Sequence, residues 1–217
     1  MKQSNRHPII QWFYQKQYAP LLDELRVGAG TRVLDIGFGT GFLKTLVHAR
    51  GAAYLGIEAD EAAYESAAAL YGREGYIQGR FPQEAPAGRA DIIFVLSCLD
   101  EVPEKAGFIA GMKSRLEPGH GVAGVAVRNR AFFVNRFKTE RIMVGRSERA
   151  RIKDLSAEEW EKLFITSGLH IATRKKFLRP WLTGFTFTSL KNLVYRLISM
   201  VVPCAQSYML YYLVKVD

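Results

Sequence analysis

The stretch VLDIGFGTGFL, Val33–Leu43, decides the fold, because a run of β-favouring residues breaks into three closely spaced glycines. Glycine adopts positive φ at no steric cost and lets a ligand approach the backbone closely. A helix that starts directly after such a turn offers free N–H groups at its first turn. The stretch therefore predicts a strand, a tight turn and a helix N-terminus that together hold a nucleotide-bearing ligand.

Length and composition are those of a globular protein. The chain has 217 residues, 48% of them apolar and 24% charged, which suits one domain with a buried core. Its longest apolar stretches fall short of the ~20 residues that cross a bilayer. Cys98 and Cys204 stand far apart, the four histidines lack ligand spacing, and residues 1–18 lack an apolar leader. We therefore expect a cytoplasmic protein without a metal.

Segments of strand and helix character alternate along the chain. Predicted strands cover residues 32–36, 53–58, 76–79, 91–96 and 122–127, with helices at about 40–50, 61–71 and 104–116. Ser156 caps a further helix that ends near Gly168, and the last strands are expected at 169–178 and 208–216. This order predicts an α/β fold with a mostly parallel sheet, helices on both faces and ligands at the carboxyl ends of the strands.

Three segments add to this pattern within one expected domain, residues 1–217. Residues 1–26 form an aromatic-rich, helical extension, and residues 128–154 form a polar, basic insertion. Residues 180–207 contain an amphipathic helix, which is expected to face the core or to serve as a lid, with a lipid-binding role as the alternative.

The glycine spacing distinguishes between nucleotide ligands. A dinucleotide fingerprint places glycines at its first, third and sixth positions. Gly37 and Gly39 fit, but the sixth position is Phe42 and the third glycine is Gly41. Asp35, at the end of the strand, would repel a pyrophosphate and suits a cationic ligand. A nicotinamide-dependent oxidoreductase is therefore disfavoured, and a purely structural turn remains the other alternative.

The segment DIGFGTG, Asp35–Gly41, resembles motif I of the class I S-adenosylmethionine-dependent methyltransferases. Two later segments, ADIIFVLSCLDEVPE and MKSRLEPGHG, resemble the strand-four motif of that family and the turn before its fifth strand. The resemblance covers roughly residues 27–127. It implies a Rossmann-like, seven-stranded, mostly parallel sheet with an antiparallel last strand, S-adenosyl-L-methionine as the cofactor, and methyltransferase activity.

The resemblance also implies which residues hold the cofactor. The glycine loop would hold its methionine part, and Glu58, 21 residues after Gly37, would bind the ribose hydroxyls. Arg80 stands where the family often has an acid for the adenine, which leaves Gln78 or Gln83 to bind that ring. The expected cofactor contacts are Asp35, Gly37, Phe38, Gly39, Gly41, Glu58, Ala59, Gln78, Gly79, Arg80, Phe81 and Ser97.

Methyl transfer mainly requires alignment of the two reactants, with a general base only for a protonated acceptor. Asp100 and Glu101 are the candidate bases, although acidic residues at such a place also begin or cap helices. Cys98 is expected to be a packing residue and His120 a solvated one. No N/D-P-P-Y/F element follows the fourth strand, which argues against amino-group methylation of nucleic acid or protein.

Most of the net charge of +9 lies in one place. Residues 128–154 contain nine basic and three acidic residues, a balance of +6. Arginine, the commoner of the two bases there, suits phosphate and carboxylate. Arg128 and Arg130 are candidate contacts for an anionic acceptor or surface, with a solvated loop as the alternative. Tyr14 and Tyr18 are candidate acceptor contacts from the N-terminal extension.

The expected function is methyl transfer to a small-molecule or lipid-like acceptor, an anionic one included. One alternative is an RNA methyltransferase that uses the arginine-rich insertion, and another is a non-catalytic partner that only binds the cofactor. An anionic membrane surface is a further candidate partner, which would make the protein peripheral to the membrane.

Overall fold

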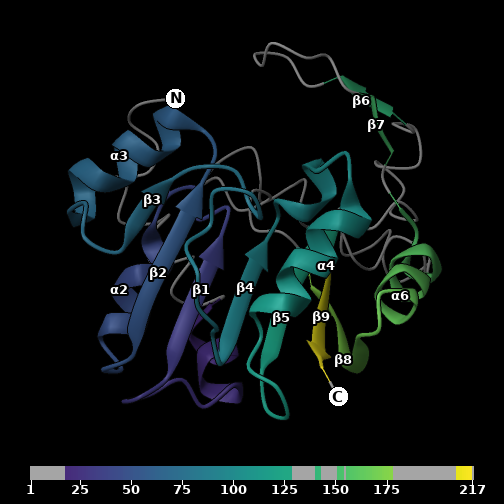
Figure 1. The fold of residues 1–217 in the computed structure, drawn as a ribbon, viewed down its shortest axis with the longest axis horizontal. Coiled ribbons are helices and arrows are strands. Elements are labelled where there is room, and N and C mark those ends of the chain that lie inside the picture. The colour runs from purple at the N-terminus through teal and green to yellow at the C-terminus, as the bar shows by residue number, and fades with distance from the viewer. Residues whose placement is uncertain (1–17, 129–139, 143–150, 154, 178–208, 217) are drawn as a thin grey trace, which may run out of the picture.

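A computed structural model describes residues 18–128, 140–142, 151–153, 155–177 and 209–216. Seven strands form one sheet in the order β3-β2-β1-β4-β5-β9-β8 (Figure 1). Their bounds are β1 (Arg32–Ile36), β2 (Ala53–Glu58), β3 (Tyr76–Gln78), β4 (Ile92–Leu96), β5 (Val122–Arg128), β8 (His170–Phe177) and β9 (Met209–Lys215).

The sheet is parallel except at its last strand. β3, β2, β1, β4 and β5 pair in parallel, while β9 lies between β5 and β8 and is antiparallel to both. The predicted fold class is therefore confirmed. Because β1 stands at the centre of the five parallel strands, its carboxyl end, where the glycine loop starts, lies in the middle of the ligand-binding edge.

The helices end where the sequence predicts. They are α2 (Phe42–His48), α3 (Glu61–Tyr71), α4 (Lys105–Arg115) and α6 (Ala157–Thr166), and residues 18–24 of the N-terminal extension are also helical. The Asp60 carboxylate accepts the Ala63 N–H at the start of α3, and Gly72 at φ 78° ends it. Ser156 and Glu159 form a capping box at α6.

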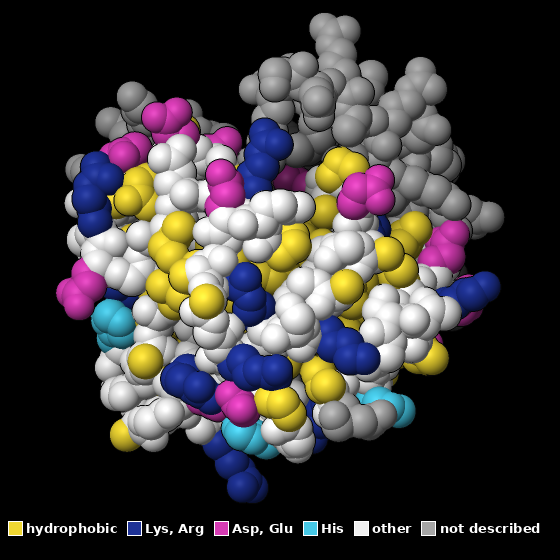
Figure 2. Space-filling view, in the orientation of Figure 1, with side chains coloured by type: hydrophobic (Ala, Val, Ile, Leu, Met, Phe, Trp, Pro, Cys, Tyr) yellow, Lys and Arg dark blue, Asp and Glu magenta, His cyan; other side chains and the backbone are white. Residues whose placement is uncertain are grey.

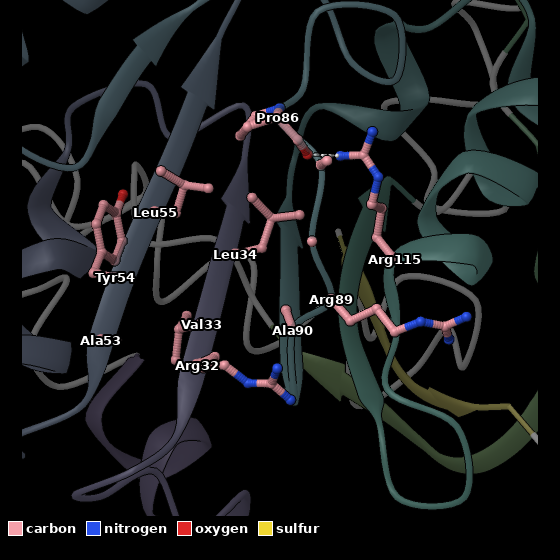
Figure 3. Close-up of a pocket in the computed structure, with 12 residues that line it drawn as sticks. Arg32, Val33, Leu34, Ala53, Tyr54, Leu55, Pro86, Arg89, Ala90 and Arg115 are labelled. Atoms are coloured by element: carbon pink, nitrogen blue, oxygen red, sulfur yellow. Dashed lines mark hydrogen bonds between the residues drawn. The ribbon is translucent and has the colours of Figure 1, made fainter.

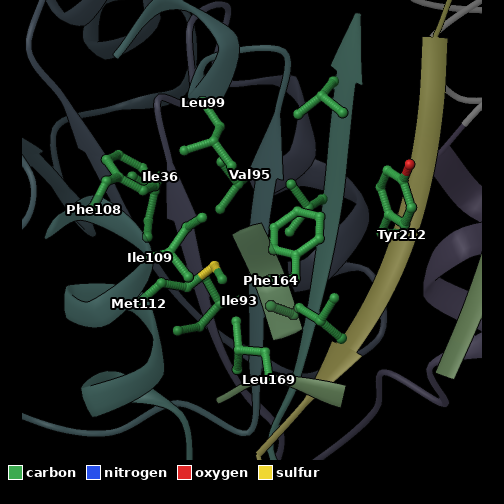
Figure 4. Close-up of a cluster of buried hydrophobic side chains, with 14 of the residues drawn as sticks. Ile36, Ile93, Val95, Leu99, Phe108, Ile109, Met112, Phe164, Leu169 and Tyr212 are labelled. Atoms are coloured by element: carbon green, nitrogen blue, oxygen red, sulfur yellow. The ribbon is translucent and has the colours of Figure 1, made fainter. Parts of the chain in front are cut away.

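The two faces of the sheet bury two separate apolar clusters. Because side chains alternate along a strand, Leu34 and Ile36 of β1 point to one face and Val33 to the other. The first face packs against α4 and α6, and Figure 4 shows side chains of β4, α4 and α6 pointing toward one another there. The second face packs against α2 and the helix at residues 18–24. The central strands are thus held from both sides.

The basic insertion contains structure that the sequence did not indicate. Within residues 128–154, β6 (Glu140–Ile142) and β7 (Arg151–Lys153) pair as a two-stranded antiparallel sheet. Arg128 belongs to β5 and so to the main sheet. Short strands of charged residues carry no clear alternating pattern, which explains why they were missed.

Charged and apolar side chains are mixed on the surface of the described residues. On the face that carries α4, Lys and Arg side chains are interspersed with apolar and uncharged ones (Figure 2). No helix among the described residues has the length and apolar content to cross a membrane.

Candidate active site

The glycine loop between β1 and α2 has a backbone shape that only glycine adopts easily. Gly37, Gly39 and Gly41 have φ values of 72°, 53° and 71°. A Cβ atom on Gly37 would lie 2.6 Å from the Cβ of Cys98, and one on Gly41 would lie 2.8 Å from that of Ala67. The backbone conformation therefore favours glycine at all three positions of the predicted motif, and close packing requires it also at Gly37 and Gly41.

Glu58 lies at the carboxyl end of β2, beside this loop. Its Oε2 accepts the Gly39 N–H at 2.9 Å, and its Oε1 accepts the Asp60 N–H at 2.9 Å. The two bonds fix the orientation of the carboxylate, while each oxygen keeps a further lone pair. A carboxylate held in this way can accept two hydroxyl groups of a ribose, as the sequence predicts, and Ala59 next to it is exposed.

Asp35 is buried at the end of β1, with 3% of its surface exposed. Its Oδ2 accepts a hydrogen bond from the Tyr54 hydroxyl at 2.9 Å. Burial, together with the charge of Glu58, raises the pKa of Asp35 to about 7, against the opposing effect of the Tyr54 bond. Among the described residues, no cationic side chain pairs with Asp35 or Glu58. The loop region thus suits a ligand that carries positive charge.

The region after β3 contains an acidic residue that the sequence analysis missed. Gln78 and Arg80 are exposed, and the Arg80 N–H donates to Oε2 of Glu84. The Cβ of Glu84 would lie 2.9 Å from a Cβ placed on Gly79. A carboxylate therefore does stand at the end of β3, but it comes from four residues farther along the chain. The ring of Phe81 packs edge-on against Phe108, with centroids 4.9 Å apart.

Ser97 and Cys98 follow β4 at the same edge of the sheet. Ser97 has a φ of 70°, and its N–H donates to the carbonyl of Ala126. The Cys98 thiol donates to the Ile36 carbonyl at 3.0 Å. Burial and the surrounding carboxylates raise the pKa of Cys98 well above its usual range, so the thiol stays neutral. Cys98 is a packing residue, as expected.

The two candidate bases contact a residue predicted to bind the acceptor. Asp100 and Glu101 lie in the short 3₁₀ helix η2 (Leu99–Glu101), so neither begins α4, whose N-cap is Glu104. The Arg128 guanidinium lies 2.9 Å from Oδ2 of Asp100 and 2.7 Å from Oε1 of Glu101. The side chain of Asp100 is 1% exposed and that of Glu101 41%. The charge of Arg128 is therefore balanced locally.

The remaining candidates are scattered. Tyr18 packs against the apolar cluster beneath α2, while Tyr14 and Arg130 lie outside the described residues. His120 is exposed and lies 3.1 Å from Asp91, which precedes β4 at the amino-terminal edge of the sheet. It is therefore remote from the glycine loop. No group of side chains that could hold a metal ion occurs among the described residues.

A separate cavity of about 220 Å³ opens at the amino-terminal end of the central strands. Its lining includes Arg32 and Leu34 of β1, Leu55 of β2, Pro86 and Arg115 (Figure 3). The Arg115 guanidinium donates to the Pro86 carbonyl and so holds the wall of the cavity. Because the glycine loop follows the opposite end of β1, this cavity plays no part in the candidate site.

Comparison with known proteins places these features in one family. Residues 10–174 match a family model described as a methyltransferase domain. A ubiquinone biosynthesis O-methyltransferase from Marinobacter nauticus is 30% identical over 187 residues, which cover 81% of this chain and 75% of that protein. A protein of the same name from Azotobacter vinelandii is 28% identical over 186 residues, covering 78% and 72%.

A solved structure agrees in fold. The S-adenosylmethionine-dependent methyltransferase from Mesorhizobium loti has a TM-score of 0.65 and 18% identity, and the match covers 91% of this chain and 96% of that one.

The raised pKa of Asp35 predicts a pH-dependent stability. The folded protein binds a proton at Asp35 up to about pH 7, whereas the unfolded chain releases it near pH 4. The free energy of unfolding should therefore fall as pH rises between these values. Asp35→Asn keeps the bond from Tyr54 and should stabilise the ligand-free protein at pH 8 by roughly 2–4 kcal/mol, measured by urea denaturation.

The matched control is Asp23→Asn, which neutralises an exposed carboxylate paired with Arg50. This substitution should change the free energy of unfolding by less than about 0.5 kcal/mol at both pH 5 and pH 8. If Asp35→Asn showed the same pH dependence between pH 5 and 8 as the unmodified protein, the assignment of the raised pKa would be wrong.

Glu58→Gln should weaken the binding of S-adenosylhomocysteine by at least about tenfold, or ~1.4 kcal/mol. The amide replaces one acceptor oxygen by a donor, which opposes the backbone N–H groups and cannot accept a ribose hydroxyl. Isothermal titration calorimetry measures the effect. Glu61→Gln, on the exposed first turn of α3, serves as the control and should leave the affinity unchanged. Equal affinity of the Glu58 variant and the unmodified protein would exclude this role.

Proposed function

The chain belongs to the class I S-adenosylmethionine-dependent methyltransferases, and on this basis we propose that it methylates a hydroxyl oxygen of a small, lipid-like acceptor. The cofactor supplies a methyl group on a sulfonium, which is already activated for displacement. The protein therefore has to bind both reactants and align the acceptor oxygen with that methyl group.

The residues at the carboxyl ends of β1 and β2 fit this cofactor. Glu58 would hold the ribose, and the loop from Gly37 to Gly41 would hold the methionine part. The uncompensated charges of Asp35 and Glu58 favour a ligand with an ammonium and a sulfonium group. At the adenine end, the Glu84 carboxylate would accept from the exocyclic amino group, a role for which Arg80 is unsuited.

The proposed class of acceptor is supported by the two similar proteins from Marinobacter nauticus and Azotobacter vinelandii. Both are named as O-methyltransferases of ubiquinone biosynthesis, and each match spans about four fifths of this chain. An acceptor of that chemistry joins a hydroxylated ring to an apolar tail. Such a molecule is small and lipid-like, in agreement with the acceptor class expected from the sequence.

A hydroxyl acceptor requires that a proton leave during the transfer. Of the two candidate bases that follow β4, Glu101 has the more accessible carboxylate, since its side chain is 41% exposed and that of Asp100 is 1% exposed. We assign Glu101 as the proton acceptor. Asp100 is buried against Arg128 and acts as a positioning residue, because it anchors the guanidinium that also contacts Glu101.

An anionic acceptor and an RNA acceptor have less support. Arg128, the described arginine of the proposed acceptor side, is already paired with two carboxylates. The other arginines that motivated these partners lie outside the residues whose side chains the structure describes. The RNA acceptor enters as an outcome of the experiment.

Transfer of labelled methyl groups tests the proposal. The purified protein is given labelled S-adenosylmethionine and a catechol with an isoprenoid tail, dispersed in detergent micelles. A mono-methyl ether should form, whereas the dimethoxy analogue should take up no label. Transfer RNA and the corresponding aniline form the comparison arms. Label on transfer RNA or on the aniline but not on the catechol would contradict the proposal.

Glu101→Gln should reduce the kcat of this reaction by about tenfold or more and flatten its rise with pH, because the amide cannot accept a proton. Its affinity for S-adenosylhomocysteine should not change. Glu104→Gln, three residues away and exposed, is the matched control and should keep full activity. A Glu101 variant with an unchanged kcat would exclude the residue as the proton acceptor.

A further inference from the structure

Lys44 of α2 is a buried lysine whose role the sequence did not indicate. Only 5% of it is exposed. Its ammonium donates to the carbonyls of Tyr71, Gly72 and Glu74 at 3.0, 3.3 and 2.6 Å. All three N–H groups are thus used at the carboxyl end of α3, where the helix dipole favours a cation. Lys44 therefore joins the end of α3 to α2, the helix that follows the glycine loop.

Tyr76 of β3 links this lysine to the loop. The Lys44 ammonium lies 4.4 Å from the centroid of the Tyr76 ring. The Tyr76 hydroxyl donates to the Gly41 carbonyl at 2.8 Å, and its ring packs against Phe38 with centroids 4.4 Å apart. Burial raises the pKa of Tyr76 above its usual value, so the hydroxyl stays protonated and donates. The loop is thus contacted at two of its residues.

The backbone of the glycine loop is held by side chains of residues outside the loop. Gly41, the N-cap of α2, makes no side-chain capping bond, and α2 has only seven residues. The Gly39 N–H is held by Glu58, and the Gly41 carbonyl is held by Tyr76. Glu58 is expected to contact the cofactor itself. Tyr76 is 6% exposed, with its hydroxyl turned to the loop backbone, so its effect on the cofactor is indirect.

We propose that Lys44 and Tyr76 are positioning residues that set the glycine loop for the methionine part of the cofactor. Lys44 fixes the position of the Tyr76 ring through the turn at residues 71–74, and Tyr76 then fixes the Gly41 carbonyl. The proposal rests on the family's cofactor and does not depend on the identity of the acceptor.

A comparison of two ligands separates positioning from general stability. S-adenosylhomocysteine has both the adenosine and the amino-acid part, whereas 5′-methylthioadenosine lacks the amino-acid part. Tyr76→Phe removes one hydroxyl and should weaken S-adenosylhomocysteine binding about fivefold, as expected for one hydrogen bond. Lys44→Met should weaken it about tenfold. The affinity for 5′-methylthioadenosine should change by less than about twofold in both variants. Calorimetric titration, well below the Tm of each variant, measures these values.

Two variants serve as matched controls. Tyr64→Phe makes the same change on another ring beside Phe38, where the hydroxyl accepts from Arg73 and has no contact with the loop. Lys162→Met removes an exposed lysine from α6. Both should bind the two ligands as the unmodified protein does. The combination of Lys44→Met with Tyr76→Phe should weaken binding less than the product of the single effects, because both act on one contact.

Three results would overturn the proposal. The first is an equal loss of affinity for both ligands, which indicates a general structural role. The second is unchanged affinity for S-adenosylhomocysteine in Tyr76→Phe, a variant that tests the proposal even if Lys44→Met does not fold. The third is a loss of S-adenosylhomocysteine affinity in the combined variant that equals the product of the two single losses. A failure of the unmodified protein to bind S-adenosylhomocysteine would instead contradict the cofactor assignment. This outcome is therefore distinguishable from a failure of the proposal for Lys44 and Tyr76.

Discussion

The burial of two carboxylates at the ends of adjacent parallel strands is the constraint on which the site depends. Asp35 and Glu58 lie at the carboxyl ends of β1 and β2, and no described cationic side chain compensates either charge. Such an arrangement is unfavourable in the free protein, as the raised pKa of Asp35 shows. It becomes favourable when a cationic ligand is bound. The protein thus keeps a local electrostatic cost, which binding of the cofactor at the proposed site would relieve.

The rest of the fold maintains this unfavourable arrangement. The central strands are covered on both faces by apolar clusters, so the ends of β1 and β2 cannot move apart to hydrate the carboxylates. Tyr54 supplies the bond that Asp35 needs, and Tyr76 and Lys44 hold the loop above it. After β4, by contrast, a cation compensates two carboxylates, because the Arg128 guanidinium pairs with both Asp100 and Glu101. Rigid strands therefore position groups that would otherwise repel one another or seek water.

Local patterns in the sequence were sufficient to predict the fold and the cofactor loop. The end of α3 followed from Gly72, and the seven-stranded, mostly parallel sheet with an antiparallel last strand followed from the family that the glycine loop resembles. Contacts between distant residues were not predictable in this way. Arg128 meets Glu101 from 27 residues away, and Tyr76 meets Gly41 from 35 residues away. No local periodicity encodes such pairs, because they arise only when the strands assemble into a sheet.

Proton release on binding of S-adenosylmethionine tests the account most directly. The cofactor should be titrated into the protein at pH 7 in phosphate and in Tris, two buffers that differ in ionisation enthalpy. If the cationic cofactor is held above Asp35, binding should lower the pKa of this carboxyl from about 7 and release part of a proton. The apparent binding enthalpy should then differ between the buffers, and the difference should vanish in Asp35→Asn. Equal enthalpies in both buffers, or uptake of a proton, would contradict the account.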